Sequence, residues 1–262
     1  MVVDNRPGAA GTIALTTVSR ASPDGYTLGI LSLSQMAAPG IFRELPYDVA
    51  RDFAPAVELV RTPLLAVVRS GIPLRSVAEL ITEASARPGQ LSFSSAGNAT
   101  PSHLAAALFQ LQAGIKLQHV PFRSGPPALV ALLGDEVDMM FTPPAMVVAL
   151  VKSGKLRALA TTAPSRNREL PDVPTMAEAG FPGMEITNWF GAVTAAGTPR
   201  AIVGRIAGEF QKALAQREVA ERYAALGMDP VLDAGPREFG ALVRSELDRW
   251  SKVVRDARIR AD

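Results

Sequence analysis

The sequence predicts an α/β fold in which short apolar strands alternate with helical segments around largely parallel sheets. Three observations favour this class. Apolar runs are bounded by turn residues, helix-patterned segments of roughly 10–15 residues separate most of them, and the segments between strands begin at proline and end at glycine. The chain has 262 residues, enough for one large domain or two smaller ones.

Seven short apolar runs are the expected strands. They cover residues 2–3, 26–31, 63–68, 91–94, 117–120, 137–141 and 156–161. The second run has no polar alternation and is therefore expected to be buried on both faces. Ser32 and Ser34 follow its carboxyl end, which is the edge where open α/β sheets usually bind ligands.

Helices are expected where capping residues meet a helical apolar spacing. These signals occur, in chain order, at residues 12–18, Ser76 with Glu79, Pro126-Pro127 with Gly134, Pro143-Pro144 with Gly154, Pro199, and the amphipathic run from Phe239 to Val254. No flexible linker interrupts the series. Two lobes, if present, must therefore be joined by ordered strands.

Composition narrows the classes of function. The 27 Lys and Arg residues nearly balance 25 Asp and Glu residues, and only 6% of the chain is aromatic. Nucleic-acid binding is not expected, because it needs a basic stripe with interleaved aromatic residues. The sequence has no cysteine and no apolar run of about 18 residues, so neither a thiolate site nor a membrane span is expected.

Catalytic and metal-binding motifs are absent from the sequence. His103 and His119 are the only histidines, and no cluster of acidic residues surrounds either one. We therefore expect no metal, no cofactor and no catalytic residue. His103 lies at the start of an expected helix, where it either donates to an anion or orders the preceding loop. His119 lies within an expected strand and is interpreted as structural.

The polar loop from Ser94 to His103 is the most informative segment. Its small residues allow close approach to the backbone, and the following helix adds partial positive charge, so the loop predicts an anion site. The alternative is a capping loop without a ligand. A second small-residue loop, residues 122–128, follows another strand at the same edge of the sheet. Arg123 in that loop either pairs with a carboxylate or points to solvent.

Together these motifs resemble the Bug receptors, the TctC-like periplasmic binding proteins of tripartite tricarboxylate transporters. The matching stretches, in order, are residues 3–9, 23–28, 45–48, 52–55, 95–103, 120–122, 134–138, 154–160, 170–175, 189–191 and 197–199. Each stretch is weak alone, but their order and spacing cover nearly the whole chain.

The resemblance implies a two-lobed, type II periplasmic-binding-protein fold, each lobe a mostly parallel sheet flanked by helices. Lobe 1 is expected to comprise residues 1–62 and 187–262, and lobe 2 residues 63–186, with crossings near 61–64 and 186–188. A small carboxylate is held between the lobes and delivered to membrane transporter subunits or a sensor. The protein is expected to be a periplasmic monomer that binds no nucleic acid.

The residues and the resemblance together give one set of expected ligand-binding positions. They are Ser32, Ser34, Ser95, Gly97, Asn98, Ala99, Thr100, His103, Arg123, Ser124, Thr142, Trp189 and Phe190. Three departures from the family pattern fall within this set. Ala99 replaces a glycine, Arg123 with Ser124 replaces a Lys-Gly pair, and Thr142 replaces an aspartate, so ligand choice is expected to differ.

The family's export signal, first strand and first helix have no counterpart in this sequence. We therefore expect a truncated gene or a misplaced start site, with unpaired ladder groups on the two neighbours of the missing strand. Two other functions stay open. One is an enzyme that uses His103 as a general base on a carboxylated substrate, and the other is a truncated chain that binds nothing.

Overall fold

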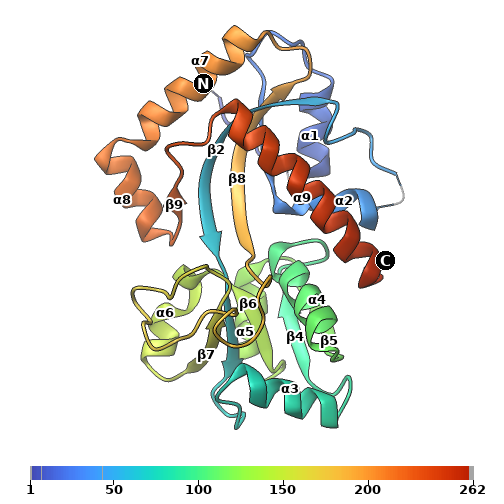
Figure 1. Cartoon of the computed structure of the whole chain (residues 1–262), viewed down its shortest axis with the longest axis vertical. Helices are drawn as coiled ribbons and strands as arrows, with labels where there is room; N and C mark the ends of the chain where they lie inside the picture. The colour runs from blue at the N-terminus through green and yellow to red at the C-terminus, as the bar shows by residue number, and fades with distance from the viewer. Residues whose placement is uncertain (1, 7, 43, 260–262) are drawn as a thin grey trace. The chain divides into compact units, whose positions relative to one another are not determined.

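The chain forms two compact units, each built around one β-sheet (Figure 1). Unit 1 comprises Met1–Arg61 with Trp189–Asp262, and unit 2 comprises Thr62–Asn188. The computed structural model describes residues 2–6, 8–42 and 44–259. The chain passes between the units within β2 (Phe53–Pro63) and β8 (Thr187–Ala195), so ordered strands connect them.

The sheet of unit 1 has the strand order β1-β8-β2-β9. β1 (Leu28–Ser32) pairs antiparallel with β8, and β2 pairs antiparallel with β9 (Asp229–Pro230). The expectation of a mostly parallel sheet is therefore wrong for these pairs. Its physical reason is that β8 enters the sheet from unit 2, so no helical crossover within unit 1 sets its direction.

Helices cover both faces of this sheet. They are η1 (Ala9–Gly11), α1 (Thr12–Ser19), α2 (Leu33–Ile41), α7 (Arg200–Leu214), α8 (Arg217–Ala225) and α9 (Pro236–Asp256). On one face Gly29 lies against α1 and Gly191 lies against Phe239 of α9. On the other face Ala192 packs with apolar residues of α7 such as Val203. The expected helices at 12–18, after Pro199 and at the end of the chain are confirmed.

Two expectations for the start of unit 1 are wrong. Val2 and Val3 form no strand and are exposed, because no neighbouring strand pairs with them among the described residues. β1 is buried on one face only, since Ile30 is 52% exposed while Leu31 is fully buried. In the sheet as described, β1 pairs with β8 on one side and is the terminal strand on the other.

The sheet of unit 2 has the order β5-β4-β6-β3-β7. Its strands are β3 (Leu65–Arg69), β4 (Ser92–Ser95), β5 (Gln118–Pro121), β6 (Met139–Thr142) and β7 (Leu156–Thr161). β4 is parallel to both β5 and β6, whereas β3 is antiparallel to β6 and β7. The sheet of unit 2 is therefore mixed, with its parallel pairs at β4.

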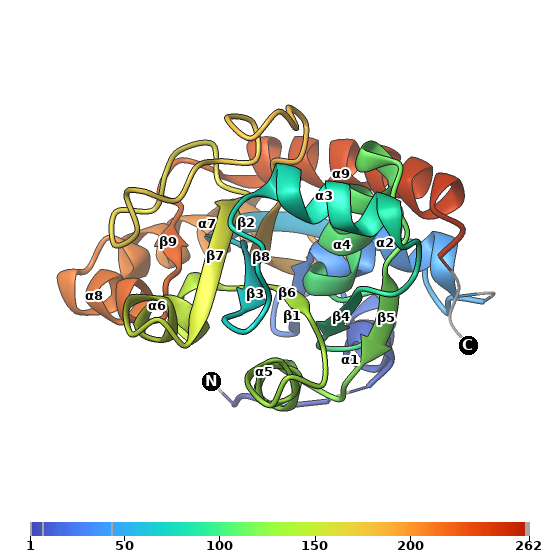
Figure 2. The ribbon, with the colours of Figure 1, turned by 90° about the horizontal axis from the view of Figure 1, so that it is seen from below.

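Four helices flank this sheet. They are α3 (Val77–Ala86), α4 (Pro101–Ala113), α5 (Gly125–Leu133) and α6 (Pro144–Lys152). α4 and α5 lie on opposite faces (Figure 2). Alternation along β6 agrees, since Phe141 contacts Phe109 of α4 while Met140 packs in the cluster that contains Leu132 of α5. Packing of α4 and α5 on the two faces of the sheet thereby positions the carboxyl ends of the parallel strands.

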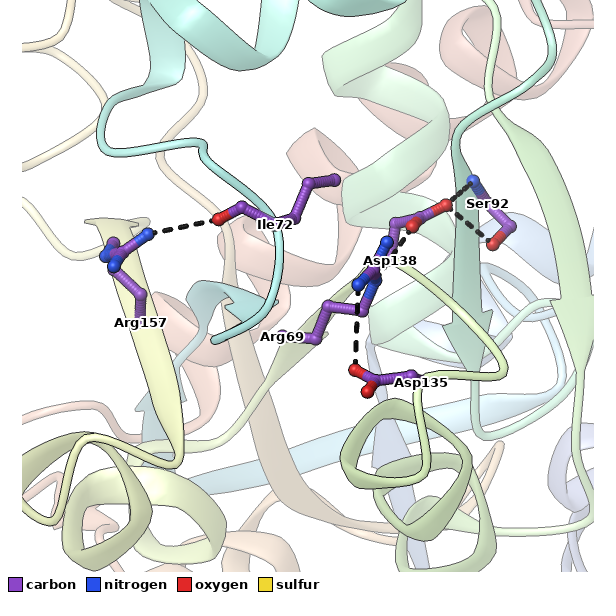
Figure 3. A network of polar contacts seen from close by, with 6 residues as sticks. All are labelled: Arg69, Ile72, Ser92, Asp135, Asp138 and Arg157. Carbon is purple, nitrogen blue, oxygen red and sulfur yellow. Dashed lines mark hydrogen bonds and ion pairs between the residues drawn. The ribbon is translucent and has the colours of Figure 1, made fainter.

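A polar network holds the opposite edge of this sheet (Figure 3). Asp138, just before β6, accepts hydrogen bonds from Arg69 Nε at 3.0 Å and from Ser92 N at 2.8 Å. Asp135 lies 3.7 Å from Arg69 as a second ion-pair partner. A cavity of about 420 Å³ adjoins the network, but the charges of Arg69 and Asp138 that line it are paired with each other. The network therefore supports the strand ends.

Candidate functional site

Three strand ends of unit 2 meet at one edge of the sheet. β4, β5 and β6 run in the same direction and end at Ser95, Pro121 and Thr142. Residues 95–103, called here the 95–103 loop, begin at the last residue of β4 and include the first turn of α4. The loop after β5 lies beside it, since Phe122 N donates to Ser95 O at 3.0 Å. The topology therefore brings both small-residue loops together.

The hydroxyl groups of the 95–103 loop form hydrogen bonds within the loop, and that of Ser95 also bonds His119 of β5. Thr100 Oγ1 donates to Gly97 O at 2.6 Å, and Ser95 Oγ accepts the Gly97 N–H at 3.1 Å. Ser102 Oγ accepts the Ala96 N–H at 3.0 Å and lies 3.0 Å from Thr100 Oγ1. Because the Thr100 proton already goes to Gly97, Ser102 is the donor in that contact. The hydroxyls shape the loop.

The backbone of the loop turns at two left-handed residues. Gly97 has φ of 120°, and a Cβ there would lie 3.2 Å from Phe122 O, so a side chain is disfavoured by both conformation and space. Ala99 also has a positive φ, 62°, which is uncommon for a residue with a Cβ. The glycine that the family resemblance implies at this position would adopt that conformation without a Cβ clash.

His103 is engaged inside the loop. Its Nδ1 accepts the Ala99 N–H at 3.2 Å, which places the proton of the neutral ring on Nε2. The ring is 8% exposed, and burial, together with the charge of His119, lowers the pKa of His103 to about 4. A general base at neutral pH needs a pKa nearer 7 and contact with substrate. Of its two expected roles, the contacts support the ordering of the loop.

Other expected positions of unit 2 differ in exposure. Arg123 and Ser124 are exposed and precede α5, and no ion pair of Arg123 occurs within the described residues. Thr142 is fully buried, and its hydroxyl lies 3.5 Å from Met146 Sδ. Arg123 is therefore available to a ligand or solvent, whereas Thr142 is committed to the unit's own packing.

The expected positions of unit 1 lie on two elements. Ser32 and Ser34 are half-buried at the start of α2, and Ser32 N and Oγ both donate to Gln35 Oε1, at 2.7 and 2.8 Å. Trp189 and Phe190 are adjacent in β8 and so point to opposite faces. Trp189 stacks edge-on against Phe239 with ring centroids 5.6 Å apart, while Phe190 packs on the α7 side.

Two buried polar atoms at β8 are unsatisfied in the described part of the chain. Asn188 Oδ1 and Trp189 Nε1 have no hydrogen-bond partner there, although Trp189 is only 2% exposed. Buried polar atoms of this kind usually have a partner. Asn188 was not among the expected ligand-binding residues, because a single asparagine in an apolar strand carries no motif.

The 95–103 loop leaves few donors for a ligand. Within the described residues, the N–H groups of Asn98, Ser102 and His103 and the side chain of Asn98 form no hydrogen bond to the protein. Ser102 and His103 lie in the first turn of α4, where amides are unpaired and the helix dipole favours negative charge. This arrangement can bind an anionic oxygen through backbone groups.

The described residues meet the requirements of neither a metal site nor a membrane-spanning helix. No group of three or more His, Asp or Glu side chains among the described residues is placed to hold a metal ion. Nor does any described helix have the length and apolar character needed to cross a membrane.

Comparison with known families gives one match along nearly the whole chain. The model of the TctC family, described as tripartite tricarboxylate transporter family receptor, matches residues 1–259. A UPF0065 protein from the tcbD-tcbE intergenic region of Pseudomonas sp. strain P51 is 37% identical over 100% of this chain and 78% of its own length. Protein BugT of Bordetella pertussis is 34% identical over 98% of this chain and 79% of its own.

Solved structures agree with this match. Rpa4515 of R. palustris with adipate has a TM-score of 0.87 at 31% identity, covering 99% of this chain and 87% of that one. The periplasmic binding protein BugD gives 0.85 at 30%, covering 99% and 88%. MatC of Rhodopseudomonas palustris with bound malate gives 0.83 at 33%, covering 94% and 85%. The expected periplasmic-binding-protein fold is confirmed.

Proposed function

We propose a function for this chain on one premise: it belongs to the family of tripartite tricarboxylate transporter receptors. Members of this family are solute-binding proteins rather than enzymes. The chain captures a small carboxylate outside the cytoplasm and presents it to membrane transporter subunits or to a sensor. It acts without a catalytic step and works as a monomer.

The donor set of the 95–103 loop is the observation that carries this proposal. The hydroxyls of the loop already have protein partners, within the loop or, for Ser95, also at His119. The amides of Asn98, Ser102 and His103 stay without a protein acceptor in the described part of the chain. Backbone donors at a helix start suit a carboxylate oxygen. The neutral ring of His103 adds no proton acceptor that would favour turnover.

Relatives of known structure support a carboxylate as the ligand class. Rpa4515 carries adipate and MatC carries malate, both dicarboxylates, and each is at least 31% identical to this chain. We therefore expect an aliphatic mono-, di- or tricarboxylate. Arg123 is exposed beside the 95–103 loop and is the cationic group placed to meet a second carboxylate.

Thermal unfolding against a panel of carboxylates tests the proposal. A ligand at 100 times its dissociation constant should stabilise the protein by about 2.7 kcal/mol. Each acid is paired with its neutral amide, which keeps the shape and removes the charge. Asn98→Ala should weaken binding, whereas the control Asn167→Ala, in an exposed loop of the same unit, should not. Stabilisation by an amide as large as by its acid would contradict the proposal.

A further inference from the structure

Three rings pack together beside the 95–103 loop. Phe93 of β4 and His119 of β5 are direct cross-strand partners, and their ring centroids lie 4.7 Å apart with planes 13° from parallel. His103 of α4 stacks on His119 at 4.1 Å and 10°. His119 therefore contacts both other rings, one from the sheet and one from the helix.

His119 is tied to the loop by a short hydrogen bond. Its Nε2 lies 2.6 Å from Ser95 Oγ, and that oxygen also accepts the Gly97 N–H at 3.1 Å. Ser95 is the last residue of β4 and faces the same side as Phe93, two residues earlier. The Ser95 hydroxyl, at the start of the loop, is thus hydrogen-bonded to the His119 ring of the neighbouring strand.

A second histidine holds the other side of the turn. His103 Nδ1 accepts the Ala99 N–H, so the two stacked rings bond to residues on either side of Asn98. Asn98 itself forms no hydrogen bond to the described part of the protein. The ring pair fixes the ends of the segment and leaves its centre available.

Packing alone does not account for His119. A phenylalanine would stack on Phe93 and His103 equally well, yet it has no group to bond Ser95. Polar ring atoms in a packed cluster are retained at a cost unless they are hydrogen-bonded. The His119 ring forms such a bond with Ser95, the first residue of the loop.

We propose that His119 is a positioning residue that holds the 95–103 loop in its ligand-binding arrangement through the Ser95 hydroxyl. It acts through Ser95 and does not touch the ligand. This inference rests on the proposed function for its link to binding, although the ordering of the loop is a property of the protein without ligand.

Two variants of His119 separate positioning from packing. His119→Phe keeps the aromatic stack and removes Nε2, whereas His119→Gln loses the ring but carries an amide of similar reach. We expect His119→Phe to speed hydrogen exchange about tenfold at the hydrogen-bonded amides of residues 96, 97, 99 and 100. It should also weaken adipate or malate binding about tenfold, the effect of losing one hydrogen bond. His119→Gln should restore exchange and affinity toward the values of the unaltered protein.

Ser95→Ala removes the same bond from its other partner and serves if a His119 variant does not fold. Combining His119→Phe with Ser95→Ala should add little to Ser95→Ala alone, because Ser95→Ala already removes the bond to His119 together with the bond to Gly97 N. Unchanged exchange in His119→Phe would overturn the proposal, as would equal behaviour of the Phe and Gln variants. If no carboxylate binds even the unaltered protein, the proposed function fails while the exchange rates still decide the positioning role.

Discussion

Acidification should destabilise the protein through His103. Burial, followed by the charge of His119, lowers the pKa of this residue from 6.5 to about 4. Between these values the unfolded chain binds more protons than the folded protein, so the contribution to stability is complete above pH 6.5 and is lost as the pH falls toward 4. For these two pKa values the loss is about 2 kcal/mol at pH 5 and about 3 kcal/mol at pH 4.

Urea unfolding at pH 7 and pH 5 measures this loss when compared with a variant that does not titrate. His103→Asn keeps an oxygen near the position of Nδ1 to accept the Ala99 N–H. Carboxylates such as Glu178 titrate in both proteins, so their effect cancels in the difference. The unaltered protein should lose about 2 kcal/mol more than the variant. Equal losses in both proteins would refute the argument that the ring is held neutral.

Four further substitutions test local geometry by urea unfolding at neutral pH. Gly97→Ala should destabilise by about 1–3 kcal/mol, because it places a side chain at φ of 120°, whereas Ala99→Gly should change stability by less than about 1 kcal/mol, since relief at φ of 62° offsets added chain entropy. Gly191→Ala should destabilise by about 1–3 kcal/mol, because its Cβ would overlap the buried Phe239 ring. Asp138→Asn should also destabilise by about 1–3 kcal/mol, because the carboxylate accepts both a guanidinium and an amide. A loss below 0.5 kcal/mol in any of the three destabilising cases would contradict the stated contact.

Local signals predicted much of the fold. Ser76 caps α3 as expected, with Glu79 N donating to Ser76 Oγ at 3.1 Å, because a capping motif depends only on residues within one turn. Glu79 departs from the full capping box, since its carboxylate accepts from Arg75 N at 2.6 Å. Proline and glycine likewise marked the bounds of α5 and α6 correctly.

Long-range pairing limited the prediction elsewhere. Strand β2 was expected only from Pro63, although it begins at Phe53. The first part of the strand was missed because it contains Glu58, and a carboxylate usually indicates an exposed position. Here the side chain is 1% exposed and accepts two hydrogen bonds from Arg61, of 2.5 and 2.7 Å. The exposed face of β1 at Ile30 was missed for a related reason, since the helices that cover a strand come from distant parts of the sequence.

The candidate site shows the same division between local and distant information. The sequence located the 95–103 loop, but it assigned the hydroxyls of Ser95 and Thr100 to the ligand, whereas in the structure both bond to Gly97 and Ser95 also bonds to His119. Ser102 and His119 were not expected to take part. His119 could have been found from the register of β5 beside β4, which makes it the partner of Phe93. That register cannot be derived until the order of the strands in the sheet is known.

The three departures from the family pattern have different physical consequences. Ala99 keeps the left-handed backbone that glycine would adopt, so the amide donors of the loop stay in place and the change is one of strain. Thr142 is buried and directed to Met146, which removes a charge without adding a ligand contact. Arg123 is the departure that alters an exposed cation, because a guanidinium forms two parallel hydrogen bonds to a carboxylate where an ammonium acts as a point charge.

Any difference in ligand preference from relatives with lysine should therefore arise at Arg123, and Arg123→Lys should shift the ranking of dicarboxylates over monocarboxylates in the same binding panel. An unchanged ranking would place the source of preference elsewhere.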